Sequence, residues 1–184
     1  AGPTQDRIVA LAKAVGVKTF PTYDTGSSVL VAGGVRSLYP AQPGLPDDPD
    51  VQQAILAAFK LDAPAKQVGV AAPWKAAKAR EWDGMSLGDW MRGEVPSEKG
   101  RSIFTAACQS IWGVDPDAVS YLYALQYAAA AGNAKSGGAF LRLITTGGGA
   151  QENRFVGGSQ LISEKAADRL GRRVVLKAPV SVVA

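Results

Sequence analysis

Apolar residues recur every three or four positions along much of the chain, a spacing typical of amphipathic helices. The first example runs through Ile8, Leu11 and Val15, with Thr4 as a candidate N-cap and Gly16 as a stop. A later stretch, residues 118–131, is apolar on nearly all sides, which predicts a buried helix. Asp115-Pro116 is the predicted start of this helix. Further helices are predicted from Asp50 until Pro64, after the caps Ser86 and Ser97, and over residues 159–170.

Strand patterns are fewer and shorter. Residues 29–32 and 35–39 are rich in apolar residues and flank Gly33-Gly34, a pair that fits a tight primed turn and predicts a β-hairpin. Prolines at 40, 43, 46 and 49 predict an extended connection after it. Short strands are also expected at residues 17–20, 140–144, 173–176 and 180–183. The pattern therefore predicts a mixed α+β chain that is mainly helical.

The residue inventory excludes several kinds of chemistry. Cys108 is the only cysteine among the 184 residues and there is no histidine, which excludes an intrachain disulfide, a cysteine or histidine zinc site and a histidine-dependent triad. The acidic cluster at 47–50 lies among prolines, so we interpret it as a solvated turn and predict no metal site.

The charge and hydropathy of the chain limit the classes of binding partner that we expect. The net charge of +4 is spread along the chain without a basic run, so we expect no nucleic acid partner. The longest apolar tract, around residues 128–131, is far shorter than a membrane span, and we expect no membrane partner. The first residues show no charged or leucine-rich leader, which favours a cytoplasmic protein.

One glycine-rich stretch, residues 143–158, is the strongest candidate for function. Gly147, Gly148 and Gly149 have no Cβ, so their backbone can lie directly against another surface, as a flat ligand would require. Gln151 follows with an amide that both donates and accepts hydrogen bonds. The same pattern also fits a simple connection between a strand and a helix, and the residues alone leave both interpretations open.

Four blocks of the sequence together resemble one family, the flavin-containing monoamine oxidases, a group that includes bacterial putrescine and tyramine oxidases. They occur in the family's order and extend over nearly the whole chain: residues 1–8, residues 73–86, residues 119–127 and residues 149–158. The resemblance implies a molecule with an FAD-binding α/β lobe and a helical substrate lobe, of which this chain is a central fragment. Residues 1–27 would be a piece of the FAD-binding lobe, residues 28–146 the substrate-binding lobe, and residues 147–184 the return into the FAD-binding lobe.

The resemblance also implies roles for individual residues. Gln151 would point its amide into the cavity above the flavin, with Tyr127 beside it. Leu143 and Ile144 match the position of an aliphatic gate, although the apolar pattern alone favours core packing for them and for Ile111. The other matching positions are Ile111, as a cavity-lining residue, and Val180, whose backbone would meet the adenine end of FAD. No catalytic acid or base is assigned.

The reaction that the resemblance implies is the oxidation of a primary amine to an imine, with oxygen reduced to hydrogen peroxide. No G-x-G-x-x-G motif occurs in the chain, so we expect the isolated chain to bind FAD poorly and to be inactive. One alternative is a stand-alone, non-catalytic binding or scaffold domain. A related flavoenzyme that acts on polyamines or amino acids is another, and it would use a charged residue such as Arg142 or Glu152.

The C-terminus raises a further expectation. The sequence stops inside an apolar, strand-like run, which suggests a piece of a longer protein. Apolar surface would then be exposed where other segments dock, and we expect that the chain can self-associate.

Overall fold

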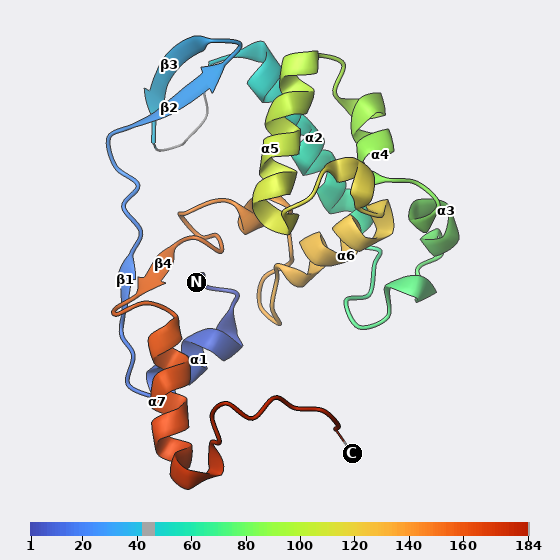
Figure 1. The fold of residues 1–184 in the computed structure, drawn as a ribbon. Helices are drawn as coiled ribbons and strands as arrows, with labels where there is room; N and C mark the ends of the chain where they lie inside the picture. Colours follow the sequence, from blue (N-terminus) through green and yellow to red (C-terminus); the bar gives the residue numbers. More distant parts are fainter. Residues whose placement is uncertain (42–46, 184) are drawn as a thin grey trace.

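The computed structural model describes residues 1–41 and 47–183 and forms two groups of elements (Figure 1). The predicted proline-rich connection lies partly outside the described residues. The first group contains a β-hairpin and most of the helices: β2 (Ser27–Ala32), β3 (Val35–Pro40), α2 (Pro49–Ala65), α3 (Ala79–Asp83), α4 (Leu87–Glu94), α5 (Glu98–Trp112) and α6 (Tyr121–Ala130). The second group joins the two ends of the chain: α1 (Asp6–Ala14), β1 (Thr19–Pro21), β4 (Asn153–Phe155) and α7 (Gln160–Leu170). The mixed α+β class predicted from the sequence is confirmed.

The larger core lies among α2, α5 and α6. Small alanines on α2 and α6, such as Ala57 and Ala124, are fully buried and let these helices approach closely. Phe104 of α5 stacks on Phe140 with ring centroids 5.5 Å apart, and both rings are buried. Because fully burying one such ring contributes roughly 1.5–3 kcal/mol, this pair is a major source of stability for the helical group.

A smaller core joins the beginning of the chain to its end. Val15 and Val17, at the end of α1, pack on Ile162 of α7. Beside them, β1 pairs antiparallel with β4, with Thr19 opposite Phe155 and Pro21 opposite Asn153. In Figure 1 these elements lie together below the hairpin, away from α3 and α4. The boundaries predicted between the two lobes, at residues 27 and 146, stay a prediction.

Several local signals in the sequence are confirmed. Ser86 and Asp89 form both hydrogen bonds of a capping box at the start of α4, and the Ser97 hydroxyl accepts from the amide of Gly100. Gly113 ends α5 in the left-handed conformation, with φ of 71°. The hairpin forms as predicted, with positive φ at both glycines of its turn.

Other predicted helix boundaries are wrong. Asp48, not Asp50, caps α2. The helix also does not stop before Pro64, because Pro64 lies within its last turn. Asp115 precedes only a short 3₁₀ turn, Pro116–Ala118, and Ser120 caps α6 instead. Thr4 does not cap α1 either, because its hydroxyl donates to the carbonyl of Ala131 at 2.7 Å. For Thr4, a tertiary contact has taken up a side chain that local rules assign to a cap.

Two predicted strand regions are also wrong. Residues 140–144 contain a 3₁₀ turn, Leu141–Leu143, and the described residues 174–183 form no strand and include a turn at residues 176–177. An isolated strand cannot satisfy its backbone groups, so apolar sequence alone does not produce one. Further 3₁₀ turns occur at Pro73–Lys75 and Gly171–Arg173.

The first residues of the chain lie against the glycine-rich turn. A Cβ on Gly2 would be 1.9 Å from the carbonyl oxygen of Gly149, and a Cβ on Gly149 would be 2.2 Å from the Thr145 hydroxyl. The amide of Asn153 donates to the carbonyl of Ala1 at 2.8 Å. The surface that these glycines approach is therefore the protein's own backbone.

The capping box at α4 predicts a specific loss of stability in acid. Hydrogen bonds from Ser86 and Arg92 lower the pKa of Asp89 to about 2, below the value of about 3.9 for an unfolded chain. The carboxylate therefore stabilises the fold above about pH 4, and this contribution is lost as the pH falls towards 2. The Asp89→Asn variant should be less stable than the parent at pH 7, with a difference that shrinks below pH 4 in thermal unfolding followed by circular dichroism. Asp168→Asn, at an exposed position of α7, is the control, and a pH-independent difference at Asp89 would contradict the prediction.

The contact of Gly149 predicts a second effect. Gly149→Ala forces the turn away from Thr145, and such overpacking typically costs roughly 1–3 kcal/mol. The control is Gly137→Ala, since a Cβ there meets no atom within 4 Å. Urea denaturation should show a loss of stability for the first variant and a change within about 0.5 kcal/mol for the second. Equal stability of the two variants would rule out the close contact.

Candidate functional site

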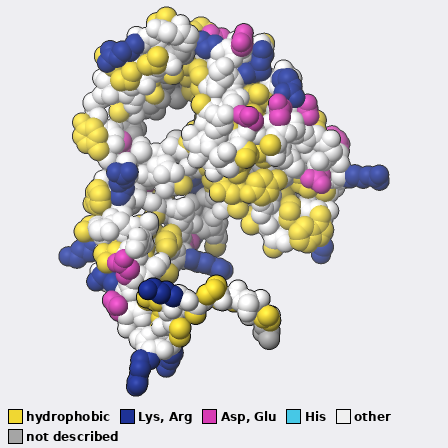
Figure 2. Space-filling model, in the orientation of Figure 1, with side chains coloured by type: hydrophobic (Ala, Val, Ile, Leu, Met, Phe, Trp, Pro, Cys, Tyr) yellow, Lys and Arg dark blue, Asp and Glu magenta, His cyan; other side chains and the backbone are white. Residues whose placement is uncertain are grey.

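The five residues predicted to contact substrate lie around one hollow of about 660 Å³. They come from distant parts of the sequence: Ile111 at the end of α5, Tyr127 on α6, Leu143 and Ile144 at the 3₁₀ turn, and Gln151 after the glycines. Figure 2 shows an opening between the hairpin and the helical group, but the described residues that line this hollow come from other elements than the hairpin. The other lining residues are Gln5, Ala106, Ala107, Ser110 and Ala150.

Gln151 is the polar group best placed to meet a ligand. Its side chain is exposed, and its Nε2 donates to the carbonyl of Leu143 at 3.2 Å. Its Oε1 accepts no hydrogen bond from the described residues. One half of the amide is thus anchored, and the other half is free to accept from the N–H of a ligand.

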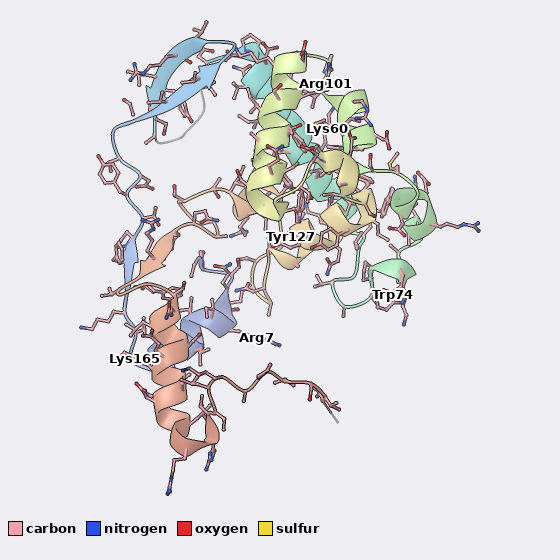
Figure 3. The ribbon with its side chains drawn as sticks, viewed as in Figure 1. Arg7, Lys60, Trp74, Arg101, Tyr127 and Lys165 are labelled. Atoms are coloured by element: carbon pink, nitrogen blue, oxygen red, sulfur yellow. The ribbon has the colours of Figure 1, made fainter. Side chains whose placement is uncertain are left out.

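Aromatic neighbours fix the ring of Tyr127. It meets Trp112 edge to face, with centroids 5.6 Å apart, and Tyr123 at 5.8 Å. In Figure 3, Tyr127 lies where the helical group meets the beginning of the chain. The ring is therefore a rigid, half-buried wall of the hollow.

The described lining of the hollow is suited to orienting a ligand rather than to moving protons. Among its described residues only Tyr127 has an ionisable side chain. Nearby, burial raises the pKa of the Cys108 thiol to about 12, so this cysteine stays neutral and unreactive. The described residues contain no group of three acidic, cysteine or histidine side chains that could hold a metal ion.

Gln5 was left out of the predicted site residues because only its proximity to a family-like block placed it near the flavin. It lines the hollow, and its Oε1 accepts from the amide of Gly2 at 2.8 Å. No periodicity marks Gln5 as a site residue, and only its position in the first family-like block could have suggested it.

Val180 does not belong to this hollow. It lies in the extended segment after α7, and its side chain is 79% exposed. Its contact with FAD therefore stays a prediction. Within the described residues, no helix has both the length and the apolar character needed to cross a bilayer.

The amino-acid sequence of this chain is similar to one segment of several known proteins. No protein-family model matches the chain. A protein of Mycobacterium tuberculosis named as a flavin-containing monoamine oxidase is 38% identical over 180 residues, which cover 97% of this chain and 38% of that protein. The human flavin-containing amine oxidase B is 31% identical over 182 residues, which cover 97% of this chain and 34% of that protein.

The fold is similar as well. A solved structure of putrescine oxidase bound to putrescine matches with a TM-score of 0.82 and 26% identity, over 97% of this chain and 39% of that one. The chain thus spans little more than a third of the length of the relatives it matches. In sequence and in fold, it belongs to the flavin-containing monoamine oxidase family and matches one segment of its members.

Proposed function

We propose that this chain forms the substrate-binding portion of an FAD-dependent oxidase that converts a primary amine to an imine, which water hydrolyses to an aldehyde. The observation that carries the proposal is the amide of Gln151, which lines the same hollow as the ring of Tyr127. Its Oε1 accepts no hydrogen bond from the described residues and is therefore available to a ligand. The relatives named above are amine oxidases, which supports the same conclusion.

The residues of the hollow would bind and orient the amine. The Oε1 of Gln151 accepts a hydrogen bond from the amine nitrogen and directs the carbon next to it towards the oxidant. The amide does not titrate in the physiological range, so it positions the amine without taking its proton. Ile111, Leu143 and Ile144 exclude water, which favours the neutral amine that can lose a hydride equivalent.

The hollow fits one face of a flat, largely apolar ring system. Its lining is apolar apart from two amides and two hydroxyl groups, and it is exposed on the side of Gln151. The flavin would supply the oxidation, by accepting a hydride equivalent from the amine and passing the electrons to oxygen as hydrogen peroxide. Gln5 and Gln151 are the residues of this chain that would border the ring, and Val180 would meet the adenine end.

The test of this function uses the polypeptide encoded by the complete reading frame. It should release hydrogen peroxide with primary amines in a peroxidase-coupled assay. Gln151→Ala should lower kcat/KM about tenfold, the usual effect of losing one orienting hydrogen bond. Gln67→Ala, at an exposed glutamine outside the hollow, is the matched control and should leave the rate unchanged.

Two outcomes would overturn the proposal. A complete polypeptide that produces no amine-dependent peroxide would favour a non-catalytic binding domain. Turnover by the isolated 184-residue chain with added FAD would refute the view that it supplies only the substrate-binding portion.

We also propose that the isolated chain self-associates through the hairpin. Strand β2 carries no charged residue, and Val29, Val31 and Leu38 of the hairpin are each at least half exposed. Exposed apolar strands without charged residues tend to pair with another copy. Light scattering should show a mass above that of the monomer, and Val31→Lys should lower it while Leu56→Lys on α2 does not. A monomeric mass at millimolar concentration would contradict this.

A further inference from the structure

Two charged residues hold the glycine-rich turn that precedes Gln151. The Arg142 guanidinium donates from Nη1 to the carbonyl of Gly148 at 2.9 Å, and the Arg142 backbone carbonyl accepts from the amide of Ala150 at 2.7 Å. On the other side, the Glu152 carboxylate accepts from the amide of Gly148 at 2.7 Å. Gly148 is therefore held at both its N–H and its carbonyl.

The turn needs this support because its own sequence provides little rigidity. Gly148 has φ of 68°, a conformation that glycine enters freely and also leaves freely. The hydrogen bonds that Gln151 itself makes, to the carbonyls of Thr145 and Leu143, are both 3.2 Å long. The position of its amide thus depends on the residues that fix the turn before it.

Arg142 occupies a position that stability alone does not favour. Its side chain is partly buried and lines a second hollow of about 260 Å³, which shares Gln5, Tyr127 and Leu143 with the first. Its Nε is buried and has no hydrogen-bond partner among the described residues. A buried, unpaired donor is costly, and positions that break local rules of stability concentrate at functional sites.

The contacts of Arg142 also argue against direct binding of substrate. Its Nη1 is engaged by Gly148, and its Nε has no accessible surface through which a carboxylate could approach. The guanidinium is thus directed at the turn.

We propose that Arg142 is a positioning residue for Gln151: it fixes Gly148 and Ala150 so that the Gln151 amide faces the amine. The catalytic consequence rests on the proposed oxidase function, whereas the contact with the turn does not.

The first experiment measures the turn in the 184-residue chain, independently of activity. Arg142→Gln removes the hydrogen bond from Nη1 to the carbonyl of Gly148 and leaves the backbone hydrogen bond of Ala150 in place. The turn should then open more often, and the hydrogen-exchange rate of the Ala150 amide should rise about tenfold. The matched control is Arg101→Gln, because Arg101 also donates from Nη1 to backbone carbonyls, those of Val95 and Pro96, far from this turn (Figure 3). Unchanged exchange at Ala150 would overturn the proposal.

The second experiment measures kinetics in the polypeptide of the complete reading frame. Arg142→Gln should lower kcat/KM for primary amines about as much as Gln151→Ala does, and Arg142→Lys, which retains a donor for Gly148, should recover part of the loss. In the Gln151→Ala background, Arg142→Gln should have no further effect, because the arginine acts through the glutamine.

Additive effects of the two substitutions would overturn the proposal. A rise in KM confined to amines that carry a carboxylate would also overturn it, because it would mean that Arg142 contacts the substrate. Faster exchange at Ala150 in a protein without amine turnover would refute the oxidase function and support the contact between Arg142 and the turn.

Discussion

The site depends on the backbone contact between Gly2 and Gly149. It brings the first residues of the chain against the turn that precedes Gln151, where no side chain would fit between them. Thr4 then reaches the carbonyl of Ala131 at the end of α6, and Asp6 accepts from Asn133. The beginning of the chain thereby packs between the helical group and the glycine-rich turn. The hollow forms where the first residues, the helical group and the turn meet.

The parts of the fold that follow from local chemistry could be predicted from the sequence. A Gly-Gly pair between apolar strands specifies its turn, and Ser86, Ser97 and Gly113 need only neighbouring backbone groups to cap a helix. The failures have a common cause. Thr4 and residues 140–144 take conformations set by distant segments, which periodicity within a short stretch does not contain.

The site was predictable only in part, for the same reason. Periodicity alone gives Ile111, Leu143 and Ile144 as ordinary core residues, and it was the resemblance to the family that grouped them with Tyr127 and Gln151. The structure brings all five to one hollow. Gln5 and Arg142 enter the site through hydrogen bonds to backbone atoms, a kind of contact that leaves no periodic mark in a sequence.

The arrangement of the two cores has a mechanical consequence. The chain crosses between them twice, once through residues 22–26 and once through residues 144–152, and the hollow has walls from both sides. Ile111 and Tyr127 belong to helices of the larger core, whereas Gln5 and Gln151 adjoin the core formed by the chain ends. The width of the hollow is therefore set by how the two cores are placed relative to one another, and neither interior alone determines it.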